Sequence, residues 1–322
     1  MIDPHLGHAS QLCCVEEVRL VGGKGDGMRL LQVRNAAGLE ITICPDRCAD
    51  IYRLIFKGDN MGYFSPTGYV APSYYDKRDD GFLKSFTAGF LTTCGLTTVG
   101  GACVDEGEEL PMHGTIGNIP CERIYWDEDA ENIFIHAVIS DSALFGRKLV
   151  LKRTICISKS ESGFTVSDTV ENQGDAVSPV MILYHMNMGY PLLSENAILQ
   201  IPSVSVVPRD ARAAEGIDTW QEILPPTPGF LEQCYYHTFD KEGSATIFNP
   251  NIGKGLTIRF DATALGYMTE WKMMGCRDYV LGLEPGNCTP DGRAAMREQG
   301  KLQILQPGDS VTYEVSVECY TT

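Results

Sequence analysis

Basic runs, long apolar runs and export signals are missing from this 322-residue sequence. The formal net charge is -16, and no cluster of Lys or Arg would follow a nucleic-acid backbone or an anionic membrane surface. No stretch approaches the roughly 20 apolar residues of a membrane span, and the first ten residues lack a cationic start followed by an apolar run. These absences predict a cytoplasmic protein that binds neither nucleic acid nor membranes.

Metal and nucleophile motifs are equally scarce. The chain has 12 Cys, but neither Cys44 with Cys48 nor Cys94 with Cys103 has the spacing of a zinc pair, and no CxxC or HExxH occurs. No G-x-S-x-G elbow marks a nucleophilic serine, and the glycine-dense segment 22–27 leads into a strand rather than a phosphate-binding helix. We therefore expect no metal, no cofactor, and mostly reduced cysteines.

The pattern that is present is period-two alternation of apolar and polar residues. It is unbroken over 311–318, recurs over 164–171, and covers 148–158 with one exception on each face, with a hairpin turn at 160–163. Further predicted strands cover 28–33, 39–44, 50–56, 132–140, 179–184, 256–260 and 279–283. The one predicted helix covers 291–299, capped by Asp291 and ended by Gly300.

Many strands with turns between them predict an all-β protein. A sheet with one apolar face must bury that face against another sheet, so we expect a sandwich or a barrel of antiparallel strands with few short helices. No repeat and no linker composition divides the chain. The simplest interpretation is a single domain over 1–322, in which the strands before residue 60 form an edge sheet.

Two titratable residues each follow an apolar strand and precede a loop rich in Gly, Asn and Pro. His185 follows 180–184, and Glu284 follows 279–283. Exchange of sugar anomers needs a base for the anomeric hydroxyl and an acid for the ring oxygen, which a carboxylate and a histidine supply. Partial burial would raise the pKa of Glu284 and suit it to base chemistry. The alternatives are a hydrogen-bonded histidine and a salt-bridged glutamate at strand ends.

Segments 183–192 and 281–287, read as LYHMNMGYPL and LGLEPGN, resemble an uncharacterised, DUF4432-like bacterial branch of the aldose 1-epimerases. Segments 45–51, 92–97 and 113–118 agree with that branch. The resemblance implies a galactose mutarotase-like β-supersandwich in which His185 protonates the ring oxygen and Glu284 acts as the base.

The resemblance also implies residues that bind the sugar. His113 matches a second histidine that orients the sugar, and Glu232 stands where characterised mutarotases have an Asp that holds sugar hydroxyls. Asn187 belongs to the first matching segment. The family arginine is missing from 92–112, so Arg47 is a candidate to replace it, unless it pairs with Asp50.

Lys272 is a further candidate for a hydroxyl or an acidic sugar substituent, beside Trp271, which would stack on a sugar face; a solvated lysine is the alternative. The sequence thus predicts a cofactor-independent mutarotase. A sugar-binding or regulatory module without chemistry, and an isomerase for an acidic or keto sugar, stay open. A homodimer also stays open, because strand faces that pack on a second copy look like core faces in sequence.

Overall fold

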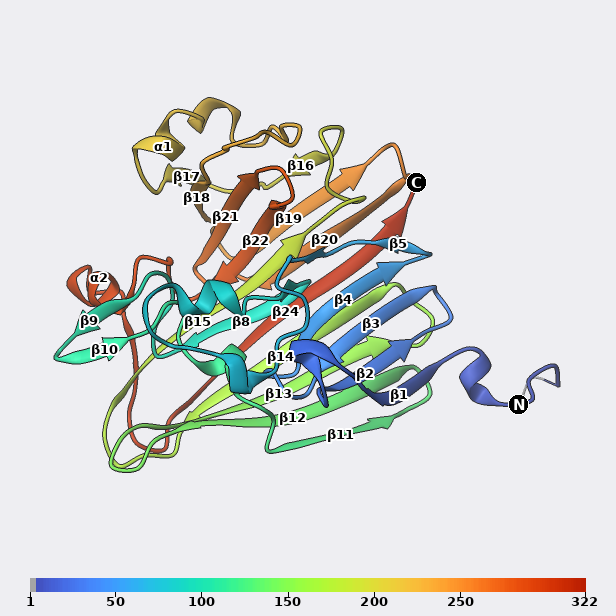
Figure 1. The fold of residues 1–322 in the computed structure, drawn as a ribbon, viewed down its shortest axis with the longest axis horizontal. Coiled ribbons are helices and arrows are strands. Elements are labelled where there is room, and N and C mark those ends of the chain that lie inside the picture. The colour runs from blue at the N-terminus through green and yellow to red at the C-terminus, as the bar shows by residue number, and fades with distance from the viewer. Residues whose placement is uncertain (1–3) are drawn as a thin grey trace.

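A computed structural model describes residues 4–322. Residues 1–3 lie outside the described part. They belong to the predicted domain 1–322 and to the first ten residues, where we expect no export signal. Antiparallel sheets dominate the fold (Figure 1). The largest has eight strands, in the order β11 (Arg123–Glu128), β12 (Asn132–Ser142), β13 (Lys148–Ser158), β14 (Gly163–Asn172), β24 (Ser310–Thr321), β20 (Lys254–Asp261), β19 (Glu242–Asn249) and β16 (Ile198–Gln200).

The second sheet carries the residues that matter for function. Its order is β17 (Ser205–Pro208), β18 (Gln233–Thr238), β21 (Tyr267–Met274), β22 (Tyr279–Gly286), β15 (Ser178–Met188) and β23 (Gln303–Leu305), with β8 (Leu91–Leu96) also paired to β15.

The strands up to residue 60, which we interpreted as an edge sheet, form a sheet of their own. Its order is β1 (Cys14–Arg19), β2 (Arg29–Arg34), β3 (Leu39–Cys44), β4 (Asp50–Phe56) and β5 (Asp59–Asn60). Two small ribbons complete the sheets: β6 (Tyr63–Phe64) with β7 (Ala88–Gly89), and β9 (Cys103–Asp105) with β10 (Glu108–Leu110).

Helices are few and short. The α-helices are α1 (Ala211–Ala214) and α2 (Arg293–Glu298), and the 3₁₀ turns are η1 (Ala9–Gln11), η2 (Gly23–Gly25), η3 (Pro72–Tyr74), η4 (Asp79–Lys84), η5 (Ile116–Asn118) and η6 (Ile217–Thr219). No helix in the described residues is long and apolar enough to cross a membrane.

Helix α2 is shorter than the sequence predicts. Gly292, not Asp291, occupies its N-cap position. The Asp291 carboxylate instead accepts hydrogen bonds from Tyr236 at 2.7 Å and Thr289 at 2.7 Å, so it is not free to cap the helix. Gly300 follows the helix with a positive φ of 66°, the conformation that commonly ends helices.

The alternating strands bury one face in a shared core. On β14, for example, Phe164, Val166 and Val170 point inward while the residues between them are less buried. Inward side chains of all three large sheets belong to one hydrophobic cluster, which includes Ile41 of β3 and Tyr184 of β15. The sheets therefore pack face to face, the arrangement of a sandwich. The twelve cysteines are free thiols, most of them buried.

Candidate active site

Strands β15 and β22 place His185 and Glu284 directly opposite each other. The pairs Leu183–Gly286 and Asn187–Gly282 flank them in the register. His185 Nδ1 lies 3.1 Å from Glu284 Oε1. Both side chains are almost fully buried, at 6% and 3% exposure. Neither atom is aligned for a hydrogen bond.

The expectation that these two residues stand where strands open into loops is wrong. Strand β15 continues to Met188 and β22 continues to Gly286, because the residues after each apolar run are also buried and pair with neighbouring strands. The pair therefore lies on the face of a rigid sheet, which fixes its spacing better than two loops would.

Gly282 makes room for the Glu284 side chain. A Cβ atom at this position would lie 2.2 Å from Glu284 Oε1 and 3.0 Å from Trp271 Cβ. The Glu284 carboxyl group therefore lies over the glycine, toward Trp271 and not away from the cavity.

His185 and Glu284 open onto a cavity of about 340 Å³, which is within the range of small-molecule sites. Aromatic rings form one wall: the His185 imidazole contacts Phe86, Trp271 and His113 edge to face, with centroids 5.2, 5.3 and 5.7 Å away. The remaining lining residues are Phe82, Leu83, Gly100, Gly101, Met112, Arg209, Glu232, Cys234, Thr269 and Pro290. A polar floor between aromatic walls is typical of sugar sites, where C–H faces stack and hydroxyls bond.

His113 enters the cavity from a strained turn. Its φ is +56°, its backbone N–H donates to Gly100 at 2.8 Å, and its ring packs on Phe82 with centroids 5.0 Å apart. Burial lowers the pKa of His113 to about 4, so the ring is neutral at physiological pH.

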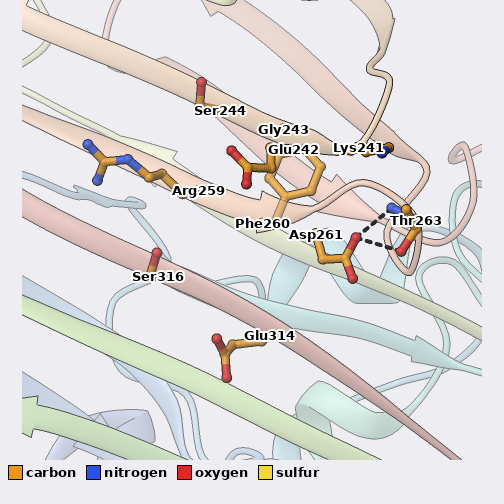
Figure 2. Close-up of a pocket in the computed structure, with 10 residues that line it drawn as sticks. All are labelled: Lys241, Glu242, Gly243, Ser244, Arg259, Phe260, Asp261, Thr263, Glu314 and Ser316. Carbon is orange, nitrogen blue, oxygen red and sulfur yellow. Dashed lines mark hydrogen bonds between the residues drawn. The ribbon is translucent and has the colours of Figure 1, made fainter.

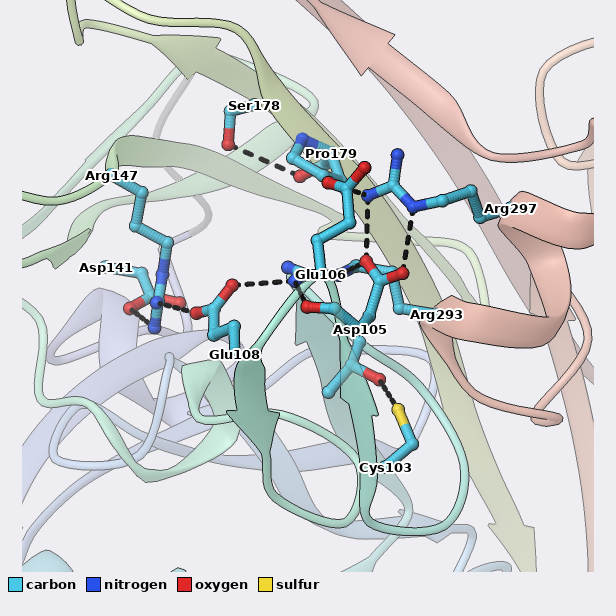
Figure 3. Close-up of polar contacts among 11 residues, drawn as sticks. Cys103, Asp105, Glu106, Glu108, Asp141, Arg147, Ser178, Pro179, Arg293 and Arg297 are labelled. Atoms are coloured by element: carbon cyan, nitrogen blue, oxygen red, sulfur yellow. Dashed lines mark hydrogen bonds and ion pairs between the residues drawn. The ribbon is translucent and has the colours of Figure 1, made fainter.

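The loop that carries His113 is anchored by ion pairs (Figure 3). Arg293 and Arg297 of α2 both bond Asp105 of the β9–β10 ribbon, at 2.6 and 2.8 Å. Glu108 bridges Arg293 and Arg147, at 2.7 and 3.1 Å. This network holds the ribbon, which follows Gly100 and Gly101 in the chain, against the helix beside Pro290 in the cavity wall.

Burial moves the two central pKa values in opposite directions. Burial, and then the charge of Glu232, raise the pKa of Glu284 well above its usual value. Burial and the nearby His113 lower the pKa of His185 to about 3. These shifts favour a neutral imidazole beside a protonated carboxyl group, so the pair holds one proton in total.

Glu232 lies at the other side of the cavity and is bonded on both oxygens. Arg209 donates to Oε1 at 2.9 Å, and the Trp271 indole N–H donates to Oε2 at 2.7 Å. Glu232 remains 45% exposed, so it can still meet a ligand.

The structure brings together five of the predicted site residues, His113, His185, Glu232, Trp271 and Glu284, and places the other three outside the cavity lining. The buried Arg47 donates to the carbonyl oxygens of Gly117, Val70 and Ser85. It therefore serves to tie three loops together. It does not pair with Asp50, whose carboxylate bonds Arg153 and Thr93 instead.

Lys272 and Asn187 are likewise engaged elsewhere. Lys272 points to the opposite face of β21 from Trp271, since neighbours on a strand alternate. There it donates to the carbonyl oxygens of Thr219 and Trp220. Asn187 donates to backbone carbonyl oxygens of Gly89 and His185.

Two polar residues of the cavity escape sequence analysis. Arg209 follows a short edge strand in a segment without a motif. Thr269 lies opposite Glu284 in the β21–β22 register and has a buried hydroxyl without a protein partner. Side chains two residues apart on a strand share a face, so Thr269 lies on the same face of β21 as Trp271. Assigning Trp271 to the cavity therefore also predicts Thr269 there.

A larger hollow of about 650 Å³ lies on strands β19, β20 and β24 (Figure 2). Its polar side chains, such as Arg259 and Glu314, spread over the strands, and the hydrogen bonds drawn in it join only Asp261 and Thr263 within a turn. It lacks convergent buried polar atoms, so the His185 cavity is the better candidate. In the described part of the chain, no group of three or more His, Cys, Asp or Glu side chains is arranged to hold a metal ion.

Solved structures with the same fold include a galactose 1-epimerase and proteins that resemble it. A Klebsiella pneumoniae protein proposed to be an aldose 1-epimerase superposes with a TM-score of 0.89 at 27% identity, over 95% of this chain and 83% of that one. A galactose mutarotase-like protein of Clostridium acetobutylicum gives 0.71 at 14% identity, over 97% and 100%. Galactose 1-epimerase of Lactobacillus acidophilus gives 0.67 at 14% identity, over 96% and 99%.

These superpositions give the chain a galactose mutarotase-like fold, which confirms the predicted fold class. Curated protein sequences yielded no match. The model of one family, described as a domain of unknown function, matches residues 25–319. The chain therefore belongs to the DUF4432 family.

Proposed function

We propose that this protein is a cofactor-independent isomerase that interconverts the anomers of an aldose. The observation that carries the proposal is the contact between His185 and Glu284, 3.1 Å apart on the floor of a cavity of sugar size. The fold shared with a galactose 1-epimerase supports it.

The reaction is a pair of proton transfers. The Glu284 carboxylate removes the proton from the anomeric hydroxyl while His185 gives a proton to the ring oxygen, so the ring C–O bond breaks and an open-chain aldehyde forms. Rotation about the bond to the aldehyde carbon and the reverse transfers close the ring as the other anomer. No atom is gained or lost, and the pair returns to its first state.

The single proton of the pair must start on the histidine for this direction of transfer. Burial favours the neutral form, with the proton on Glu284. The two forms carry the same net charge, and the 3.1 Å contact is short enough for the proton to pass after a small side-chain rotation. Sugar hydroxyls that bond to the carboxylate would stabilise the reactive form, since hydrogen bonds favour the charged state.

Proton NMR of anomer exchange tests the proposal. Purified protein should accelerate equilibration of a freshly dissolved aldose, and Glu284→Gln and His185→Asn should each slow it by roughly 10²-fold or more. Glu40→Gln and His136→Asn, on strands away from the cavity, are matched controls that should keep the parental rate.

Two results contradict the proposal. If either site variant equilibrates anomers as fast as the parent, the assignment of acid and base is wrong. If calorimetry shows sugar binding while exchange proceeds no faster than in buffer, the protein is a binding module without chemistry.

A further inference from the structure

Strand β11 forms one edge of the eight-stranded sheet. Among the described residues it pairs with β12 on one side and with no strand on the other, and Figure 1 shows it at the rim of the molecule. The backbone N–H of Asp129 donates to the Asn132 carbonyl oxygen at 3.0 Å where the β11–β12 hairpin closes. Ladder hydrogen bonds alternate along an antiparallel strand, so residues 124, 126 and 128 present their N–H and C=O groups outward. Such a row is a template for another strand.

Two aromatic side chains of β11 are exposed, Tyr125 by 48% and Trp126 by 42%. The Tyr125 ring stacks on His136 with centroids 4.8 Å apart, which holds it on the outer face of the sheet. Trp126 lies opposite the buried Ile135 in the register, so it belongs to the core face at its margin. The other edge strand of six residues, β1, exposes two glutamates instead. Exposed aromatic rings on an open edge favour β11 as a surface that binds a partner.

The sequence of β11, RIYWDE, is complementary to itself when two copies run antiparallel. A two-fold axis perpendicular to the sheet keeps both outer faces on the same side, so outer residues must lie opposite outer residues. With the axis at Tyr125, Arg123 lies opposite Asp127 of the second copy. Ile124 then lies opposite Trp126 of the second copy. This register joins opposite charges on the outer face and apolar side chains on the core face, two kinds of cross-strand pair that stabilise sheets.

The backbone fits the same register. Ile124 and Trp126 both face outward, so each such pair across the axis exchanges its two N–H···O=C bonds. Arg123 and Asp127 then form non-hydrogen-bonded pairs, in which opposite side chains approach most closely. A register shifted by two residues would instead place Ile124 opposite Glu128, an apolar side chain against a carboxylate. Side chains and backbone therefore select the same alignment.

The charges on this edge specify pairing. Charged residues commonly protect an edge strand, because like charges of two copies meet when the edges approach. On β11 the positive charge stands at the start and the negative charges stand at the end, so antiparallel copies bring unlike charges together. The net charge of -16 on each copy opposes association at long range, but salt at about 0.15 M screens exposed charges more than about 8 Å apart. The local pairs therefore decide the outcome at that salt concentration.

We propose that the protein forms a homodimer in which two copies of β11 pair antiparallel about Tyr125 and join their eight-stranded sheets into one continuous sheet. The inference is independent of the proposed function, since β11 lies outside the lining of the His185 cavity. A strand of six residues gives a smaller contact than the interface of a tight dimer, so we expect monomer and dimer to exchange at roughly micromolar concentrations.

Sedimentation equilibrium of the full chain in about 0.15 M salt tests the dimer, and charge reversal tests the register. Symmetry repeats every contact, so Arg123→Asp creates two like-charged pairs, and Asp127→Arg does the same with the opposite sign. Each variant should raise the Kd of the dimer at least about tenfold. Arg259→Asp and Glu314→Arg, on the interior strands β20 and β24 of the same sheet, change the net charge equally and should associate like the parent.

The decisive measurement mixes the two charge-reversed proteins. An equimolar mixture of Arg123→Asp and Asp127→Arg has an attractive pair at both positions, so it should dimerise as tightly as the parent. The double variant should do so by itself. Both side chains are exposed, so thermal unfolding of each variant should match that of the parent.

Three results overturn the proposal. The first is a parent that stays at 35.4 kDa up to about 200 µM, well above the Kd expected for this contact. The second is a single charge reversal that leaves the Kd unchanged, which would place any dimer contact elsewhere. The third is a mixture, or a double variant, that associates no better than the single variants.

Discussion

At the scale of single residues, Thr269 is the polar group whose role can be isolated most cleanly. Its hydroxyl is buried beside Glu284 without a protein partner, so a bound sugar would supply the missing hydrogen bond. Thr269→Val keeps the shape and should lower kcat/KM for anomer exchange roughly tenfold. Protein stability should hold or rise, since an unsatisfied buried hydroxyl is removed. Thermal unfolding and NMR exchange measure both, with Thr312→Val on β24 as control; an unchanged kcat/KM contradicts the assignment.

The acid–base pair makes a separate prediction about stability and pH. As pH falls from 6.5 to 4.5, the unfolded pair gains a proton on His185, whereas in the folded pair burial lowers the pKa of His185 and raises that of Glu284, so the proton goes to Glu284. By linkage, proton uptake by folded Glu284 offsets uptake by unfolded His185, so the pair adds little pH dependence to the free energy of unfolding in this window. In Glu284→Gln, the unfolded histidine still gains a proton below pH 6.5, while the folded one does not until about pH 3. The variant should lose about 2 kcal/mol relative to the parent as pH falls from 6.5 to 4.5.

Urea unfolding of the parent and the variant across this range checks that sign. Adding His185→Asn to Glu284→Gln removes the titrating group, so the double variant should regain the shallow dependence of the parent. Parallel stability curves for the parent and Glu284→Gln would show that the pKa of His185 is not lowered in the folded protein.

At the scale of elements, the β15–β22 register and Gly282 set the geometry of the site. Gly282→Ala places a methyl group 2.2 Å from Glu284 Oε1, and the carboxyl group, at the end of a flexible side chain, must move. A displacement near 1 Å costs roughly 10²-fold in rate, so kcat should fall between ten- and a hundredfold. Gly266→Ala, where the nearest atom is 3.9 Å away, is the matched control. Parental kcat in Gly282→Ala would show that Glu284 need not lie over this glycine.

Strand alternation predicts most of the elements but not their pairing. The predicted strands 39–44, 50–56 and 148–158 match β3, β4 and β13 residue for residue, because each has one apolar face. The same logic is silent about register, which decides that His185 faces Glu284. Strands β15 and β22 run past their apolar stretches because tertiary pairing, and not local hydrophobicity, buries the residues that follow.

Strand alternation likewise predicts the position of some binding residues but not of others. Trp271 and Lys272 are adjacent on a strand, so alternation allows only one of them in the cavity, a constraint that the sequence already contains. The position of Arg47 depends on carbonyl oxygens 23, 38 and 70 residues away, and that of Arg209 on side chains contributed by β18 and β21. No local pattern encodes such distant partners, so the positions of Arg47 and Arg209 could not be predicted before the fold was known.

At the scale of the whole molecule, one buried arginine joins the three large sheets. Arg153 of β13 bonds Asp168 of β14 at 2.7 Å, Asp50 of β4 at 2.9 Å and Thr93 of β8 at 2.7 Å. Its side chain has no exposed surface. Arg153→Met would leave two buried carboxylates without their cation, which typically costs 3–5 kcal/mol.

The pH dependence of that loss distinguishes an electrostatic role from lost packing. Burial already raises the pKa of Asp50, and removal of the guanidinium raises it further. A folded carboxyl group with a raised pKa loses stability as pH rises, so the cost of Arg153→Met should be largest near pH 7 and shrink in acid. Adding Asp50→Asn and Asp168→Asn to Arg153→Met should recover more than half of the lost free energy of unfolding. The control Arg259→Met removes an exposed ion pair and should cost under about 1 kcal/mol. A cost that is independent of pH, and that the added substitutions do not reduce, would mean that Arg153 holds the sheets by volume alone.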